Sequence, residues 1–349
     1  MKKNVNQALS ILLCCIFLLF LLFQSNKCIE LASNGLLIWY RNMIPSLFPF
    51  MVLSGFLIRS KLSVKIGKIL TPILGTIFQL PSQMLYAIFM GFLCGFPMGA
   101  KMVSDMLENK QITEKQGEFL LAFCNNIGPL YMLGYVCPLF DYQNVYHLLG
   151  CMYFVPFAYG LILRYIHYYN YVPQAKFYTK TFSCKYKNSN ESTIINSPLK
   201  ICSYKDSNDE CINYILCFQQ SLSSAIEQIT MLGGCMIFFN CMLIFPEQLE
   251  VFFNSQPNPN PLTFLFPSTL KALFEIGGGL QELEIILSKN HNSFSYFLPL
   301  TLLTFGGLSC IAQTCFIIKN TGLKISTYIK HKLVQSCIYI LFIFITYFL

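Results

Sequence analysis

Long apolar runs separated by short polar segments dominate the chain. Six runs have the length of about 20 residues that a membrane-spanning helix needs; they cover 36–58, 119–140, 145–166, 221–245, 294–318 and 333–349. An earlier apolar stretch, 8–23, follows Lys2 and Lys3 and lacks the small-residue cleavage site of a signal peptide, so it is interpreted as a retained first helix with a cytoplasmic N-terminus. The pattern predicts an all-α integral membrane protein.

Three further apolar regions are short or interrupted. The first, 66–78, ends before Pro81, and the second, 84–96, ends in Gly-Phe-Pro. The third, 262–288, is interrupted by Lys271, Glu275, the glycine triplet 277–279 and Glu282. Hydrophobic segments broken by Gly or Pro are a sequence indicator of a transporter's binding site, so we expect broken or re-entrant helices and about seven to ten membrane segments in all. Interfacial amphipathic helices are the alternative.

Composition supports the same class. Hydrophobic residues make up 54% of the chain and charged residues 11%, with a mean hydropathy of +0.53, whereas soluble domains carry roughly 25% charged residues. This excludes a soluble enzyme, a nucleic-acid-binding domain and a disordered scaffold. The net charge of +8 comes from lysines between apolar runs, where they act as topology signals. They predict that 59–68, 167–211 and 319–332 are cytoplasmic and that the acidic 246–261 is outside.

The order of elements predicts two related halves. We expect an N-terminal anchor helix at 1–35, a first membrane half at 36–167, a polar Lys-rich cytoplasmic linker at 168–211 and a second membrane half at 212–349. Residues 95–101 align with 307–313, and each half begins with a long helix that precedes a broken segment. Many secondary transporters are built from such repeats and bind substrate at the interface between them.

The broken segments supply the candidate substrate-binding residues. They are Gly95, Pro97, Gly99, Lys101, Asn125, Asn126, Gly128, Pro129, Glu275, Gly277, Gly278, Gly306, Gly307, Ser309 and Gln313. A helix that begins after Pro97 would direct N–H groups and the Lys101 charge toward an anion; the alternative is a helix end whose lysine reaches the interface. An amide pair before Gly-Pro in an apolar run indicates an unwound segment that binds substrate, or else hydrogen bonding between helices. Upstream, Thr113 and Gln116 have the spacing of a capping box.

In the second half, Glu275 precedes the glycine triplet. Its carboxylate could bind a coupling cation or a proton, or could form an ion pair with Lys271 four residues earlier. The segment 306–313 combines a glycine pair with a hydroxyl and an amide, although small residues at helix contacts often serve packing alone.

Nothing in the chain indicates catalysis or a bound cofactor. The sixteen cysteines include no CxxC pair and the four histidines are scattered, so neither a disulfide framework nor a metal site is expected. No nucleophile–base arrangement and no Walker A motif is present. We therefore expect a protein that is not an enzyme and that uses no cofactor.

Four motifs together resemble a known family. The runs GFPMGAKMVSDM, FCNNIGPLYMLG, LFEIGGG and FGGLSCIAQ are similar, in this order, to the YlbJ family of sporulation integral membrane proteins, which resemble nucleoside-recognition gate domains and, distantly, concentrative nucleoside transporters. The likeness covers about 36–165 and 218–349. In this chain Ile127 stands where the family has Ser, and Gly277-Gly278 stands where it has Thr-Asn; both departures remove polar groups.

The resemblance implies a function. It implies a multi-pass protein of the mother-cell-derived outer forespore membrane that moves dipicolinic acid, a small aromatic dianion, during sporulation. Its partners would be membrane lipid and this solute, without nucleic acid; a homo-oligomer or a complex with other sporulation membrane proteins stays open. The alternatives are a nucleoside transporter of the same fold and a scaffold that acts through the linker without transporting.

Overall fold

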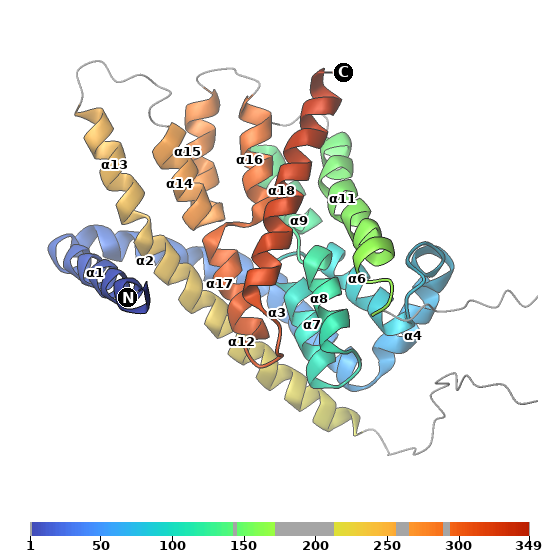
Figure 1. Ribbon diagram of the computed structural model, residues 1–349. Helices are drawn as coiled ribbons and strands as arrows, with labels where there is room; N and C mark the ends of the chain where they lie inside the picture. The colour runs from blue at the N-terminus through green and yellow to red at the C-terminus, as the bar shows by residue number, and fades with distance from the viewer. Residues whose placement is uncertain (1, 142–144, 172–212, 256–264, 289–293, 349) are drawn as a thin grey trace, which may run out of the picture.

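Every regular element that the structure describes is a helix. The computed structural model describes residues 2–141, 145–171, 213–255, 265–288 and 294–348 (Figure 1). The elements up to 171 are α1 (Lys2–Phe23), α2 (Ser25–Ile38), η1 (Trp39–Met43), α3 (Ile44–Arg59), α4 (Leu62–Leu70), η2 (Thr71–Gly75), α5 (Thr76–Phe78), α6 (Ser82–Cys94), α7 (Met98–Glu108), α8 (Glu114–Cys124), α9 (Pro129–Tyr131), η3 (Met132–Val136), α10 (Cys137–Leu139), α11 (Val145–Ile162) and η4 (Leu163–His167). Those after 212 are α12 (Tyr214–Met242), α13 (Ile244–Asn254), α14 (Leu265–Phe274), α15 (Ile276–Ser288), α16 (Phe294–Phe305), α17 (Gly307–Ile318) and α18 (Ile325–Phe348).

Several of these helices can cross a membrane. In the described part of the chain, five are long and apolar enough, at Ser25–Arg59, Glu114–Leu139, Leu148–His167, Tyr214–Phe253 and Leu298–Ile318. A sixth is counted if 62–78 and 82–94, which meet at a bend of 90°, form one span. The larger number expected from the sequence also includes α1, α18 and the remaining hairpin region. The chain is an all-α integral membrane protein, as its apolar pattern predicts.

Helices α6 and α7 form a hairpin with its tip at 95–97. Gly91 in α6 and Gly99 in α7 both lie against the carbonyl oxygen of Cys124. In a continuous helix, residues eight apart would lie about 12 Å from each other along the axis, so the chain must fold back between them. At the tip, Gly95 has a φ of +80° and lies against the backbone of Gly128. The hairpin therefore packs, backbone against backbone, onto the break between α8 and α9.

A second hairpin, α14–α15, has its tip at Glu275. Gly279 in α15 lies against the backbone of Ala272 in α14, so the two helices touch without a side chain between them. The break between α16 and α17 lies against this tip, since a Cβ on Gly307 would be 3.0 Å from the Leu273 carbonyl oxygen. Both outer ends of this hairpin lie at the top of Figure 1, whereas α7 ends at the bottom. The two hairpins thus enter from opposite ends of the molecule.

This arrangement corrects the alignment between the halves. The sequence pairs residues 95–101 with 307–313. The structure places Gly95 at a hairpin tip, whereas Gly307 lies at the break within a single span, Leu298–Ile318, that does not turn back. The equivalent elements are the hairpins α6–α7 and α14–α15, the broken helices α8–α9 and α16–α17, and the following helices α11 and α18. Similar glycine content misled the alignment because both a tight turn and a helix break need glycine.

Two long helices join the halves. Helix α3 packs along α12, which crosses the base of the molecule in Figure 1. Helix α2 also packs on α12, and its boundary with α3 is fixed by Trp39, whose indole N–H donates to the Ile229 carbonyl oxygen at 2.8 Å and whose ring lies against Gly233. The expected limit of the anchor segment, residue 35, falls inside α2. The expected linker 168–211 lies almost wholly outside the described residues.

Candidate functional site

The candidate site lies where the two hairpin tips and the two helix breaks meet. Each tip packs on the break of its own half, and the halves then touch each other across the middle of the molecule. Phe96, at the first tip, lies against Gly306 in the second break, where an added Cβ would be 2.8 Å from the ring. Tyr135, after the first break, donates its hydroxyl to the Gly277 carbonyl oxygen at the second tip over 2.6 Å. The predicted segments of both halves therefore converge.

Asn125 is the first polar side chain of the break after α8. It is fully buried, and its amide oxygen accepts a hydrogen bond from the backbone N–H of Ala100 at 3.3 Å. Its amide nitrogen donates to the hydroxyls of Thr314 and Tyr328, both at 3.0 Å. Ala100 is in the first turn of α7, so the side chain satisfies one of the N–H groups that the sequence leaves free for an anion. Asn125 joins α7, α17 and α18.

Asn126 faces a lysine that the sequence does not single out. The Asn126 amide oxygen lies 2.9 Å from the Nζ of Lys332, and its amide nitrogen donates to the Phe123 carbonyl oxygen at 2.5 Å. Lys332 is fully buried and also donates to the Gln335 side chain at 3.2 Å, while its ammonium lies 4.9 Å from the centre of the Phe96 ring. Gln335 in turn donates to the Ala122 carbonyl oxygen at 2.7 Å. Helix α18 therefore supplies an amide and a cation to the unwound segment.

Lys101 has an internal counter-ion. Its Nζ lies 2.9 Å from a carboxylate oxygen of Asp105, one turn further along α7, and both side chains are buried. Burying two charges is costly, and their attraction offsets that cost only when the geometry is good. The second carboxylate oxygen of Asp105 is buried and has no hydrogen-bond partner among the described residues. The Lys101 charge is therefore already balanced inside the first hairpin.

Glu275 occupies the tip of the second hairpin. Its carboxylate accepts the backbone N–H of Gly278 at 2.8 Å and is buried to 4% exposure. It does not pair with Lys271, the alternative that the spacing allows. Lys271 instead contacts Glu250 at 2.7 Å, and also Glu282. The acid at the tip is thus stabilised by backbone donors, and the lysine ties α14 to α13 and α15.

The remaining predicted residues surround this centre. Ser309 and Gln313 lie one turn apart on α17, joined by a hydrogen bond of 3.1 Å, and both are buried. Pro97 precedes the first residue of α7, and Pro129 is the first residue of α9. The glycines at 95, 99, 128 and 307 serve the backbone contacts between tips and breaks. Which of these side chains contact a solute stays a prediction.

Sequence reasoning missed the contribution of α18. Tyr328, Lys332 and Gln335 share one face of this helix, at spacings of four and three residues. Lys332 was assigned to the cytoplasmic charge cluster before the last span because three other lysines lie nearby. The signal that could have found it is this polar stripe inside an apolar run, since intramembrane polar residues usually face the bundle interior.

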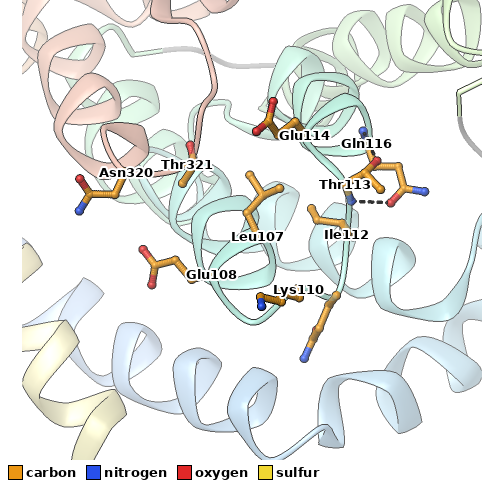
Figure 2. A pocket seen from close by; sticks show the side chains of 10 residues that line it. Leu107, Glu108, Lys110, Ile112, Thr113, Glu114, Gln116, Asn320 and Thr321 are labelled. Carbon is orange, nitrogen blue, oxygen red and sulfur yellow. Dashed lines mark hydrogen bonds between the residues drawn. The ribbon is translucent and has the colours of Figure 1, made fainter.

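A cavity of about 430 Å³ (Figure 2) opens between two helix connections that lie at the lower end of the molecule in Figure 1. Its lining comes from the α7–α8 connection and the α17–α18 connection, including Glu108, Glu114, Asn320 and Thr321. The connection is ordered by the predicted capping box, in which Thr113 and Gln116 exchange side-chain and backbone hydrogen bonds. A neighbouring cavity shares Glu108 and Asn320 and reaches Gln313. The second cavity therefore reaches one of the predicted site residues from this end.

The described ranges contain no candidate metal site and no disulfide. No group of three or more His, Cys, Asp or Glu side chains there could hold a metal ion. The thirteen cysteines described are all free thiols.

Comparison with known proteins finds two similarities. A family model described as Gate, nucleoside recognition, matches residues 40–139, which include the first hairpin and the first helix break. The chain is also 24% identical over 325 residues to the sporulation integral membrane protein YlbJ of Bacillus subtilis (strain 168), covering 88% of this chain and 74% of the relative. The chain is therefore similar to YlbJ along most of its length, and part of its first half is similar to gate domains. No solved structure matches. The resemblance seen in the four sequence motifs is confirmed.

Proposed function

We propose that this chain is a transporter of a small polar solute and that the site lies where the tips and breaks meet. The observation that carries this proposal is the cluster of buried polar groups around Asn125, Asn126 and Lys332, within otherwise apolar helices. Polar groups at membrane depth are costly and mark substrate or ion pathways. Hairpins and broken helices of inverted halves are the arrangement in which secondary transporters bind solutes. Movement of the halves against each other would then expose the site to either side.

The solute that we propose is dipicolinic acid, crossing the outer forespore membrane during sporulation. The similarity to a sporulation integral membrane protein supports the setting. The chemistry of the centre supports the solute, because a small aromatic dianion needs donors for its carboxylates and aromatic groups for its ring. Amides, a lysine and Phe96 supply both kinds of contact.

A nucleoside is the second candidate solute. The matched family model carries the description nucleoside recognition, and side-chain amides such as those of Asn125 and Asn126 can bind a base or a ribose. A neutral nucleoside would need less positive potential than a dianion.

Uptake by proteoliposomes distinguishes the two solutes. Purified protein would be reconstituted and supplied with labelled dipicolinic acid, with uridine as competitor. We expect saturable uptake that uridine does not inhibit. Uptake of uridine instead would support the nucleoside transporter. If folded protein takes up neither solute, a scaffold or a missing partner subunit becomes the better explanation. For a scaffold, deletion of the loop 168–211 should abolish function, whereas for a transporter the loop should be dispensable.

Two substitutions test the location of the site. Asn126→Ala and Lys101→Ala should each abolish uptake while the protein still accumulates in the membrane. Asn34→Ala removes an exposed amide from α2, outside the tips, the breaks and the cavity lining, and serves as the matched control. Normal uptake by both site variants would contradict the assignment.

A further inference from the structure

The structure distinguishes three buried lysines by their partners. Lys101, Lys271 and Lys332 are each 3% exposed or less. Lys101 has Asp105, and Lys271 has Glu250 and Glu282. Among the described residues, no ion pair involves Lys332. It is therefore the one buried lysine in this part of the chain whose charge no carboxylate balances.

The contacts of Lys332 are weak ones for an ammonium group. The group has three donor hydrogens, and the described partners are the amide oxygens of Asn126 and Gln335 and the rings of Phe96 and Tyr328. Burying an ammonium without an anion is costly, and neutral amide oxygens compensate less than a carboxylate does. A carboxylate that replaced one of these oxygens would form the stronger, charge-assisted bond.

The position of Lys332 suits a solute that enters from either side. The residue lies seven positions after the start of α18, about 10 Å along the helix from its lower end. Its partners come from both halves: Asn126 from the first break, Phe96 from the first tip and Gln335 from α18 itself. A solute bound there would touch both halves at once.

We propose that Lys332 is the residue that selects a carboxylate-bearing solute, by binding one carboxylate in place of an amide oxygen. The inference rests on the proposed transport function, which it deepens, and it moves the charge selection from Lys101 to Lys332. Lys101 is already paired with Asp105, one turn along the same helix. The Phe96 ring, next to the ammonium, lies beside the aromatic ring of the solute.

The test compares two ligands of nearly the same shape, one a dianion and the other neutral. Binding of dipicolinate and of its neutral analogue, pyridine-2,6-dicarboxamide, would be measured on purified full-length protein by equilibrium dialysis. We expect Lys332→Gln to weaken dipicolinate binding by roughly tenfold to a hundredfold, the range for a lost hydrogen bond to a charged group. Binding of the diamide should change little. Lys330→Gln removes an exposed charge from the same helix and should change neither.

A second variant keeps the lysine and covers the case in which Lys332→Gln does not fold. Asn126→Asp has nearly the same shape and places a carboxylate where the amide oxygen lies 2.9 Å from Nζ. It should weaken dipicolinate binding and leave the diamide bound, because the lysine then has an internal anion.

The outcomes separate the inference from the function. If wild-type protein binds dipicolinate and both variants bind it equally well, or lose both ligands to the same extent, Lys332 does not select the charge and only the inference fails. If wild-type protein binds neither ligand, the proposed dipicolinate transport fails, and the inference fails with it.

Discussion

At the scale of single residues, Asn125 shows why an unwound segment can persist inside a membrane protein. A break in a helix leaves backbone and side-chain groups that lipid cannot satisfy. Asn125 meets this need in both directions, since its oxygen accepts from α7 and its nitrogen donates to α17 and α18. One amide thus fixes the break, the first hairpin and the second half relative to one another.

Asn125→Ala should therefore destabilise the protein as well as impair uptake. The substitution leaves the Ala100 N–H and the Tyr328 hydroxyl without their partner, and a buried polar group without a partner costs about 1–3 kcal/mol. Thermal unfolding in detergent should show a lower midpoint than the wild type. Asn320→Ala, which removes an exposed amide, is the control; an unchanged midpoint for Asn125→Ala would mean that water replaces the lost bonds.

Sequence reasoning reached some of these residues and not others. The Asn125-Asn126 pair could be predicted because amides before Gly-Pro in an apolar run are unusual. The partners of charged groups could not: Lys271 pairs with acids 21 and 11 residues away rather than with Glu275. Lys332 was missed because local charge density is the same for a lysine at the interface and for one that faces inward.

At the scale of elements, glycine determines how each hairpin meets its broken helix. Gly91, Gly95 and Gly99 recur every four residues, and each lies against the backbone of the break at 124–128. Only Gly95 has a positive φ. The other two are helical, so they serve close approach and not an unusual backbone conformation.

Gly99→Ala tests this contact without straining the helix. A methyl group there would overlap the Cys124 carbonyl and lie 2.8 Å from the Asn125 Cα, and overpacking of this kind costs about 1–3 kcal/mol. We expect lower thermal stability and loss of uptake. Gly234→Ala, at a helical glycine with open space around it, should be neutral or stabilising by about 0.5–1 kcal/mol. Equal behaviour of the two variants would contradict the close-approach argument.

Lys271 provides a second prediction at this scale, because it joins α13, α14 and α15. Lys271→Met should lower the free energy of unfolding by about 1–2 kcal/mol, less than the ~3–5 kcal/mol of a fully buried pair, because Glu250 and Glu282 are 32% and 39% exposed. Denaturation in detergent would measure the change. Lys27→Met, at a more exposed ion pair, should lower the free energy of unfolding by less. If Lys27→Met lowers it by more than Lys271→Met does, the Lys271 contacts do not hold the hairpin.

The breaks could be predicted from sequence, but the direction of the chain after each break could not. Gly and Pro indicate where a helix ends. At 95–97 the chain turns back, whereas at 125–128 and at 306 it continues across, and all three segments have similar composition. What decides is the tertiary contact: the first tip turns because Gly91 and Gly99 can both reach the same carbonyl.

At the scale of the whole molecule, the two halves are held together by contacts of two kinds. The long helices α3 and α12 pack along each other, as do α8 with α18 and α7 with α17. Around the centre the halves share polar bonds, such as the Tyr135 hydroxyl with Gly277 and Ser104 with the Ile317 carbonyl oxygen at 3.0 Å. All of these contacts come from described residues outside the chain that connects the halves.

Co-expression of the halves as separate chains tests whether these contacts are sufficient to join them. Fragments 1–190 and 191–349 should copurify and restore uptake, because the contacts that join them lie outside the linker. A tag on one fragment and detection of the other would measure the association. The same fragments with Gly99→Ala in the first should still associate through α3 and α12 while losing uptake. Fragments that fail to associate would show that the linker contributes to assembly.

The contact of each hairpin with its own helix break restricts the route open to a solute. Where backbone touches backbone, as at Gly95 with Gly128 and at Gly307 with Leu273, no gap wide enough for an aromatic ring can form without unfolding the tip. A solute that crosses this protein must therefore pass along the seam between the halves. There the Phe96 ring lies against Gly306, a flat surface opposite a residue without a side chain. Under the proposed transport function, rotation of this ring would admit planar molecules and exclude bulky ones.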